Sequence, residues 1–335
     1  MKISKLSLLL VVFWSLFLGA CQGSWVSLKP TGDLALYVEP RKIDTFVVLS
    51  GGGFRGVFEI SALYCLTEVV GIEVDGYAGV SIGAIVGAMA VQDKISEFRT
   101  QWLSFEDKDE IFQEPGVFGA LVALLSGKTG LNDISKLQIF ISENIDINKL
   151  RTSGIEFQVG VVNFQTGNYE THRPDNPDFL SSILASVSVP VAFPLVEVNG
   201  QQYGDGGVKH MLPLDYLDYA IAAGAKRIIV ILPFNRKNTY IPYKEEFSRI
   251  REKNENLIDV AERLSELVMH TIYSADVREL ERIVALNHEV EFIIIEPEQD
   301  SENCNFGVLG EFDHDRMVRC DGEAHEIVLK VFETN

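Results

Sequence analysis

The stretch TFVVLSGGGFRG, residues 45–56, places a short apolar run directly before a cluster of glycines. A run of β-branched and aromatic residues of this length, ended by glycines, is typical of a buried parallel strand. An amphipathic segment follows from about Val57 to Val70. The stretch therefore predicts a strand, a glycine-rich turn and a helix, and this unit sets the fold class expected for the chain.

The same strand-to-helix order is repeated along the chain. A second apolar run near 77–80 ends at Ser81, and Ile82 to Val91 follows as a predicted helix rich in small residues. Further strands are predicted at 157–162, 201–204, 227–232 and 292–295, and a long helix is predicted near 254–286. Strands that alternate with helices predict a single α/β domain with a mainly parallel sheet.

The composition limits the classes of partner. The 335 residues include 48 acidic and 29 basic side chains, for a formal net charge of −19, and 47% are hydrophobic. Such a surface repels the phosphates of nucleic acids, so nucleic acid is excluded as an expected partner. It also repels anionic lipid head groups, and a protein of this charge needs another means of staying at a membrane.

The N-terminus offers that means. Two lysines precede an apolar run over 6–18, which is too short to span a bilayer comfortably and fits an export signal. The sequence LGAC, ending at Cys21, resembles the lipobox of bacterial lipoproteins, although an ordinary secretory signal with a chance cysteine is the alternative. We expect a lipoprotein signal peptide over 1–20, lipid on Cys21, a lipidated tether over 21–42 and one domain over 43–335.

In bacterial lipoproteins, the residue after the lipidated cysteine indicates whether the protein stays at the inner membrane or is moved to the outer one. Gln22 stands where an aspartate would favour the inner membrane. We therefore expect a lipid-anchored protein of the bacterial cell envelope, at the outer membrane rather than the inner one.

Residues 79–83, GVSIG, place Ser81 between the second predicted strand and its helix. A GxSxG turn lifts a serine hydroxyl above the sheet, and Gly79 and Gly83 avoid clashes in its strained backbone. The helix that follows points its first amides and its positive dipole end at a developing oxyanion. The motif predicts a nucleophilic serine, with a purely structural turn as the alternative.

The glycine cluster at 51–56 is compatible with two functions. Consecutive glycines let backbone N–H groups converge on an anion, because no side chain intervenes. Gly51, Gly53 and Gly56 also satisfy the GxGxxG pattern of dinucleotide-binding proteins. Glu73 and Asp75 lie at about the distance beyond it where such proteins carry an acidic residue. A dinucleotide site does not need a serine turn on the next strand, so we favour an anion-binding loop.

A third motif, Asp205-Gly206-Gly207, directly follows the predicted strand 201–204. Asp-Gly is a common turn dipeptide, and by itself it is more often structural than functional. A carboxylate held at a strand end on a permissive turn is nevertheless a candidate base.

GGGFRG, GVSIG and DGG, in this order, resemble the motifs of the patatin-like phospholipase family. The segment ASVSVPVAFP, residues 185–194, is also similar to the block that precedes the aspartate strand in that family. The resemblance extends from about Ile43 to Asp215. The chain departs from the pattern at Met211, where the family often carries asparagine two residues before the proline that follows DGG. The resemblance implies a three-layer patatin-like α/β fold, with helices on both sides of a mainly parallel central sheet.

The resemblance also implies a lipid acyl hydrolase, of phospholipase A, lysophospholipase or carboxylesterase type, that acts on membrane lipids or other fatty-acyl esters through a covalent acyl-enzyme. Ser81 would be the nucleophile and Asp205 its general base, a dyad that is chemically sensible if the carboxylate is partly desolvated. The alternatives are a dinucleotide-binding protein that uses Gly51–Gly56, and a catalytically silent lipid-binding lipoprotein.

The resemblance assigns supporting roles to the residues around the dyad. The oxyanion amides would come from Gly51, Gly52 and Gly53 and from Ile82. Arg55 would steady this loop or meet a phosphate, with a salt bridge to a nearby acid as the alternative. No cofactor is expected.

The remaining polar candidates give no metal site, because the histidines are scattered and the cysteines lack ligand spacing. A Ser–Asp–His triad would need a histidine beyond Asp205, and none has a distinctive context; the candidates are His210, His270, His288, His314 and His325. In an oxidising compartment we expect a Cys304–Cys320 disulfide and a buried thiol at Cys65. The apolar run 117–125 is either a mobile cover over an acyl-chain pocket or part of the core.

Overall fold

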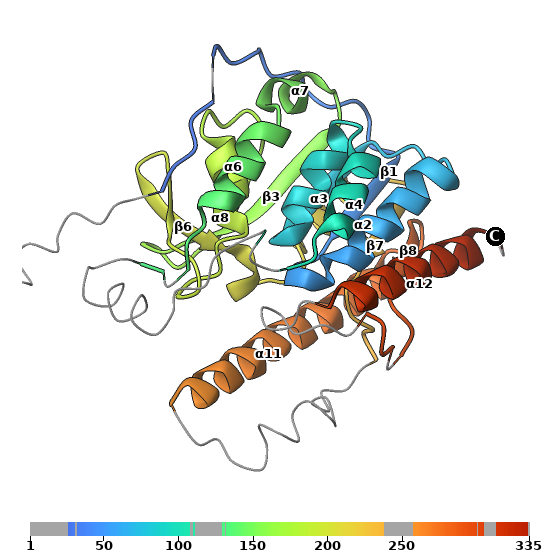
Figure 1. Ribbon diagram of the computed structural model, residues 1–335. Helices are drawn as coiled ribbons and strands as arrows, with labels where there is room; N and C mark the ends of the chain where they lie inside the picture. The colour runs from blue at the N-terminus through green and yellow to red at the C-terminus, as the bar shows by residue number, and fades with distance from the viewer. Residues whose placement is uncertain are drawn as a thin grey trace, which may run out of the picture.

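The computed structural model describes residues 26–30, 32–107, 110, 129–130, 132–237, 257–299, 301–304 and 313–333 (Figure 1). The expected signal peptide over 1–20, the expected lipidation site Cys21 and the apolar run 117–125 lie outside the described residues. Within these ranges, no helix combines the length and the apolar character that a transmembrane span requires.

Eight strands in the described part of the chain form one mixed sheet, ordered β5-β6-β3-β2-β1-β7-β8 with β4 also paired to β3. Strands β3, β2, β1, β7 and β8 are mutually parallel, whereas β4, β5 and β6 are joined by antiparallel pairing. The strands are β1 (Thr45–Leu49), β2 (Gly76–Val80), β3 (Glu156–Asn163), β4 (Tyr169–His172), β5 (Val196–Val198), β6 (Gln201–Asp205), β7 (Arg227–Ile231) and β8 (Glu291–Ile295).

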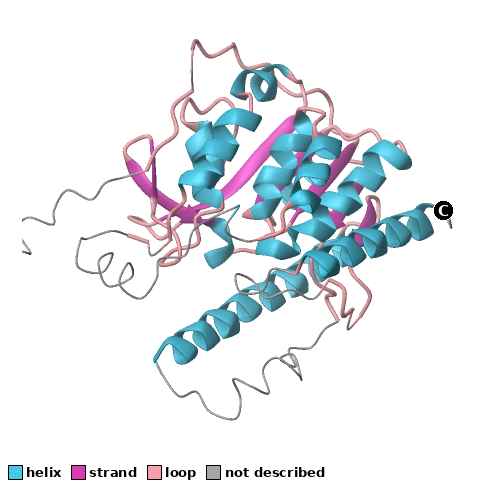
Figure 2. Cartoon of the chain, in the orientation of Figure 1, coloured by secondary structure: helices cyan, strands magenta, loops and turns pink. Residues whose placement is uncertain are grey.

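Helices flank this sheet, and several of them cover its near face in Figure 2. They are α2 (Gly56–Tyr64), α3 (Ile82–Val91), α4 (Ile95–Ser104), α6 (Ser135–Asn144), α7 (Ile147–Thr152), α8 (Phe179–Ser186), α9 (Asp215–Ala223), α11 (Leu257–Leu286) and α12 (His314–Glu333). Shorter helical turns are η1 (Gly53–Arg55), η2 (Cys65–Val69) and η4 (Gly206–Val208).

The two faces of the sheet carry separate apolar cores. In β1, Val47 and Leu49 belong to the core that includes α2, α3 and α8, whereas Phe46 and Val48 belong to the core that includes α9 and α11. Successive side chains of a strand point to opposite faces, so a strand buried on both faces is apolar at every position. The expected three-layer α/β architecture is confirmed.

The length of β3 brings the ends of two other strands together. Val159 and Gly160 of β3 each pair with both β2 and β4, so these two strands lie on opposite edges of β3. A later part pairs at once with β4 and β6, so β6 lies on the same edge as β2. Val80 pairs with Gly160 and Asp205 pairs with Val161, so the ends of β2 and β6 meet at consecutive positions of β3.

The described part of the expected tether, residues 26–30 and 32–42, lies against the domain. Val26 bridges Val196 of β5, and Lys29 forms an ion pair of 2.6 Å with Asp178 beside α8. Farther along, the Val38 N–H donates to a carbonyl of α7 at 2.8 Å. We call these residues the N-terminal strap.

The C-terminal helix α12 is fixed to the body by covalent and polar contacts. A disulfide joins Cys304 to Cys320, with the Cα atoms 4.9 Å apart, and Cys65 is a buried free thiol. Asp321 of α12 accepts hydrogen bonds of 2.6 Å from Arg99 of α4 and from Ser61 of α2. These bonds join α12 to two helices of one layer.

Candidate active site

Ser81 lies on the sharp turn between β2 and α3. Its backbone angles, φ 55° and ψ −129°, are unusual for a residue with a side chain and mark local strain. Its N–H donates to the Ser186 hydroxyl at 2.9 Å, and that hydroxyl donates to the Gly160 carbonyl at 2.8 Å. Ser186 of α8 therefore ties the strained turn to β3.

The two outer glycines of the GxSxG motif are required by close backbone approach. A Cβ atom on Gly79 would lie 2.2 Å from the Gly83 carbonyl oxygen, and one on Gly83 would lie 2.7 Å from the Ser50 carbonyl oxygen. Atoms at these distances overlap, and backbone atoms cannot move aside as the end of a side chain can. The motif thus packs the first turn of α3 directly against β2 and the end of β1.

Asp205, the last residue of β6, is buried beside the serine. Its N–H donates to the Ser188 carbonyl at 2.9 Å, and its Oδ1 accepts the Gly207 N–H at 2.7 Å. The Ser81 hydroxyl lies close enough to the carboxylate to act on its pKa as a hydrogen-bond donor. Burial raises the pKa of Asp205 to about 7, against the opposing effect of the Gly207 and Ser81 hydrogen bonds. A carboxylate with this pKa accepts a proton readily near neutral pH.

The glycine loop after β1 lies against the serine, but its amides are not equivalent. A Cβ atom on Gly51 would lie 3.2 Å from the Ser81 Cβ. The Gly51 N–H donates to the Met211 carbonyl at 2.9 Å, so this amide is already used within the protein. The expectation that Gly51 supplies an oxyanion amide is therefore wrong for this structure.

Two other sources of amides follow directly after Gly51 and Ser81 in the sequence. Gly52 is the N-cap of the 3-10 turn η1, Gly53 is the first residue of that turn, and Ile82 begins α3. The first N–H groups of a helical turn have no partner within that turn. These amides are the ones that could stabilise an oxyanion formed at Ser81.

The last two residues of the glycine motif pack beside this site. The Arg55 guanidinium lies over the Phe234 ring, 4.1 Å from its centroid, and the residue is buried. A Cβ atom on Gly56 would lie 2.3 Å from the Ile82 side chain. Gly56 therefore allows α2 to approach the start of α3, and Arg55 has a cation–π contact that the sequence did not indicate.

The turn after Asp205 is equally tight. A Cβ atom on Gly206 would lie 2.6 Å from the Gly160 carbonyl oxygen, and one on Gly207 would lie 2.9 Å from the Asp205 Oδ1. Both glycines of the DGG motif therefore permit a close approach that holds the carboxylate at the end of β6.

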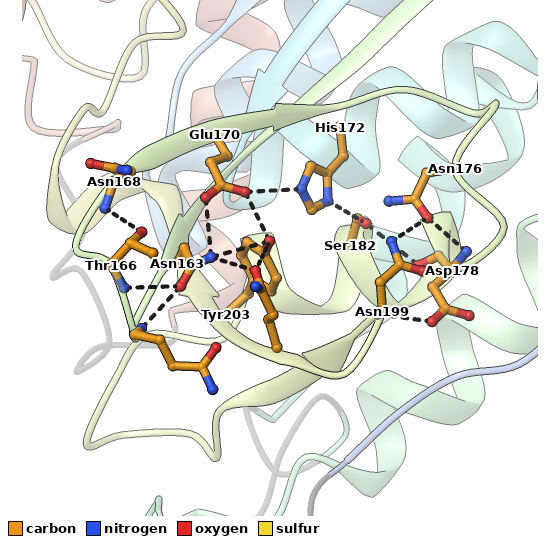
Figure 3. A network of polar contacts seen from close by, with 12 residues as sticks. Asn163, Thr166, Asn168, Glu170, His172, Asn176, Asp178, Ser182, Asn199 and Tyr203 are labelled. Carbon is orange, nitrogen blue, oxygen red and sulfur yellow. Dashed lines mark hydrogen bonds and ion pairs between the residues drawn. The ribbon is translucent and has the colours of Figure 1, made fainter.

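The histidines lie in contacts other than a triad with Ser81. His210 pairs with Asp276 at 2.9 Å, and His314 with the Phe105 carbonyl at 3.0 Å. In Figure 3, His172 lies between Glu170 and Ser182, with Nδ1 2.8 Å from the serine oxygen. These residue types match a triad, yet Ser182 is fully buried on α8, so a substrate cannot reach its hydroxyl.

The network in Figure 3 instead joins β3 and β4 to β6, the strand that ends at Asp205. The Tyr203 hydroxyl of β6 donates to the Glu170 carboxylate of β4 at 2.8 Å, and the Asn163 amide of β3 donates to the same carboxylate at 3.1 Å. Tyr203 lies two residues before Asp205, so these bonds fix β6 next to β3 and β4.

No role in the site was assigned from the sequence to Ser186, Met211 or Asp276. Ser186 lies within the 185–194 segment, where only the resemblance called attention to it. Met211 had been noted as a departure from the family pattern, and the structure shows its carbonyl holding Gly51. Asp276 lies on the stripe of α11 that includes Tyr273 and Leu280, and an acid on such an apolar stripe was a usable signal.

Among the described residues, no group of three or more His, Cys, Asp or Glu side chains could hold a metal ion. The groups that the structure brings together at the site are the Ser81 side chain, the Asp205 carboxylate and nearby backbone amides.

Comparison with known proteins bears on the family. The model of the patatin-like phospholipase family matches residues 47–218. The chain is 26% identical to a cGAMP-activated phospholipase of Pseudomonas aeruginosa (strain BWHPSA011 / Pa011) over 177 residues, which are 48% of this chain and 52% of that protein. It is also 26% identical to probable lipid hydrolase 463L of Invertebrate iridescent virus 6 over 191 residues, 53% of this chain and 64% of that protein. The chain therefore spans between half and two thirds of the length of these relatives.

Solved structures are similar at lower identity. VipD from Legionella pneumophila is 12% identical with a TM-score of 0.43, and the match covers 95% of this chain and 73% of VipD. The type III effector protein ExoU is 13% identical with a TM-score of 0.40, and the match covers 89% of this chain and 54% of ExoU.

Proposed function

The chain belongs to the patatin-like phospholipase family, and from this premise we propose that it is a lipid acyl hydrolase that uses Ser81 as nucleophile and Asp205 as general base. The observation that carries the proposal is the buried Asp205 carboxylate, which lies beside the Ser81 hydroxyl and has a pKa raised to about 7 by burial. Near neutral pH such a group is ionised in part and basic enough to take the serine proton.

The acylation step follows from these positions. As the Ser81 Oγ bonds to the ester carbonyl carbon, its proton passes to Asp205. The carbonyl oxygen becomes an oxyanion, and the amides of Gly52, Gly53 and Ile82 are the donors at hand. The bond to the alcohol then breaks, the alcohol takes the proton from Asp205, and the acyl group stays on Ser81.

Deacylation uses the same groups in the same order. Asp205 takes a proton from a water molecule whose oxygen bonds to the acyl carbon. The bond to the Ser81 Oγ breaks, the serine takes the proton back from Asp205, and the fatty acid leaves. One base serves both halves of the reaction because each half begins with a neutral hydroxyl that must lose its proton.

We propose fatty-acyl esters of membrane lipids as the substrates, with the protein anchored at the bacterial outer membrane through lipid on Cys21. Support comes from the matched relatives, whose names are phospholipase and lipid hydrolase. The strap begins at Val26, five residues after Cys21, a distance of at most about 17 Å for an extended chain. A lipid on Cys21 would hold the strap and its domain close to the bilayer.

The experiment that tests the proposal is hydrolysis of a nitrophenyl butyrate and of a phosphatidylcholine by the detergent-solubilised full chain. We expect Ser81→Ala and Asp205→Asn each to lose about 10³-fold or more in kcat. Ser182→Ala is the matched control, because it removes the hydroxyl next to His172 and should keep full activity. Chelation by EDTA should leave the rate unchanged.

Three outcomes would contradict the proposal. Turnover that survives Ser81→Ala would remove the serine mechanism, and loss of activity in Ser182→Ala would move the chemistry to His172. A folded wild type that binds lipid vesicles but hydrolyses neither ester would make the chain a lipid-binding protein.

A further inference from the structure

Asp276, in the middle of α11, is a buried carboxylate with an unusual set of partners. Its side chain is only 4% exposed. Its Oδ2 accepts the N–H groups of Met211 at 2.6 Å and Leu212 at 3.2 Å, and its Oδ1 lies 2.9 Å from the His210 Nδ1. One carboxylate thus holds three consecutive residues of the loop that follows the DGG turn.

That loop in turn holds the glycine loop. The Met211 carbonyl accepts the Gly51 N–H at 2.9 Å and the Ser50 hydroxyl at 3.1 Å. The peptide groups of Met211 therefore connect α11 on one side with the end of β1 on the other. Because Gly51 lies against the Ser81 Cβ, the connection reaches the nucleophile in two hydrogen bonds, from Asp276 to Met211 and from Met211 to Gly51.

The same loop is closed onto the turn that carries the base. The N–H groups of Lys209 and His210 donate to the Gly206 carbonyl at 2.9 and 3.0 Å. The Met211 sulfur lies 3.1 Å from the position that a Cβ on Gly207 would take. A shift of Met211 would therefore disturb the glycine loop and the Asp205 turn together.

Other groups face His210 and Asp276 from neighbouring elements. The Tyr169 ring of β4 meets the His210 ring edge to face, with centroids 5.1 Å apart. The hydrogen bond to Asp276 raises the pKa of His210, burial opposes it, and the charges of Asp215 and Lys209 act on it in opposite directions. Protonation of His210 therefore strengthens its pairing with Asp276.

Asp276 lies beyond residues 47–218, the part of the chain that the family model matches. Its neighbours on α11, Tyr273 and Val277, form a small apolar cluster with Met211. The cluster excludes water around the hydrogen bonds, so an N–H group that lost its acceptor here would stay unsatisfied and would destabilise the loop. The loop accordingly depends on Asp276 for its conformation.

We propose that Asp276 is a positioning residue: through Met211 it sets the place of the glycine loop, and with it the oxyanion amides, relative to Ser81. The proposal rests on the proposed hydrolase function. A misplacement of about 1 Å in a catalytic group can cost about 10²-fold in rate. Loss of Asp276 should therefore lower kcat, whereas a purely structural residue would lower stability alone.

The test compares Asp276→Ala and Asp276→Asn in the full chain in detergent, at a temperature where each is folded. Asp276→Ala should lower kcat by about 10–100-fold and change KM less than about threefold, because the misplaced amides act on the transition state. Asp276→Asn should recover most of the rate, because the amide oxygen can accept both N–H groups while its NH₂ donates to a neutral His210.

The matched control is Asp321→Ala, which removes a buried aspartate that joins α12 to α2 and α4. It should lower stability and leave kcat within about twofold, as expected for a residue that touches no catalytic group. Equal losses of kcat in Asp276→Ala and Asp321→Ala would overturn the proposal. Wild-type kcat in Asp276→Ala, or no recovery in Asp276→Asn, would also overturn it.

Amide hydrogen exchange supplies a readout that does not depend on activity. In Asp276→Ala the glycine loop 50–56 should exchange faster than in the wild type and in Asp321→Ala, because Gly51 loses a fixed acceptor. Unchanged exchange would overturn the proposal. If the wild type hydrolyses no ester, the proposed function fails, and exchange still decides whether Asp276 holds the glycine loop. If Asp276→Ala does not fold, kcat and amide exchange of Asp276→Asn are compared with those of the wild type instead.

Discussion

Asp205→Asn is expected to make the protein more stable while it removes the proposed catalytic base. Burial raises the pKa of Asp205 from 3.8 to about 7. Because the folded-state pKa lies above the unfolded value, the Asp205 carboxyl group contributes its full stabilisation below about pH 4. This contribution to the free energy of unfolding is lost as the pH rises through 7. The change from 3.8 to about 7 corresponds to about 4 kcal/mol, at about 1.4 kcal/mol per pKa unit.

Asparagine suits the site because it has nearly the shape of a protonated aspartic acid and carries no charge to desolvate. Its oxygen can accept the Gly207 N–H, and its NH₂ can donate to the Ser81 hydroxyl. Above pH 8 the variant should therefore exceed the wild type in free energy of unfolding by up to about 4 kcal/mol.

The assay is urea denaturation of both proteins from pH 4 to pH 9 with the disulfide intact. We expect the two free energies of unfolding to be similar near pH 4 and to separate progressively up to pH 8, while the variant stays inactive. A difference that does not change with pH, or a wild type that is the more stable at pH 8, would refute the reasoning from burial.

Asp321→Asn provides a control of opposite sign. Burial acts to raise the pKa of Asp321, but the hydrogen bonds from Arg99 and Ser61 outweigh it and the net pKa is lowered. A lowered folded-state pKa gives stability that is present above pH 4 and lost as the pH falls. Asp321→Asn should therefore be less stable than the wild type at pH 8, by a margin that shrinks in acid.

The remaining predictions concern the turn, the base and the thiols. The plot of kcat/KM against pH should rise with a midpoint near 7 and level off above about pH 8, because only ionised Asp205 accepts the serine proton; a midpoint near 4 would contradict the burial of the base. Ser81→Gly should be more stable than Ser81→Ala by about 1 kcal/mol in thermal unfolding, since glycine adopts a φ of 55° without strain. Gly83→Ala should be destabilised by at least about 2 kcal/mol or fail to fold, because its new methyl group would lie 2.7 Å from the Ser50 carbonyl oxygen. Normal stability and activity would show that the contact relaxes and would contradict this prediction. Thiol titration of the unfolded, unreduced chain from residue 22 onward should find one thiol, that of Cys65, and three would rule out the disulfide.

The sequence alone determined the parts of the fold that are local. The run 45–49 and the glycines after it identified β1 and its turn, and GVSIG located Ser81 between a strand and a helix, because each pattern lies within one strand–turn–helix unit. The short strands β4 and β5 were not predicted, since elements of four and three residues are too short for an alternating pattern to be distinguished from chance. The pairing of Ser81 with Asp205 came from the family resemblance rather than from any spacing.

Tertiary structure decided what the site residues can do. The pairing of β3 with both β2 and β6 brings Ser81 and Asp205, which are 124 positions apart in the sequence, into contact. The burial of Asp205 in this arrangement raises its pKa. The use of the Gly51 amide by Met211, and the hold of Asp276 on that loop, depend equally on contacts between distant segments. A sequence pattern reports which face of its own element a residue occupies, whereas hydrogen-bond partners and desolvation depend on the elements packed against it. For that reason the proposed nucleophile could be located from the sequence, and the basicity of its partner could not.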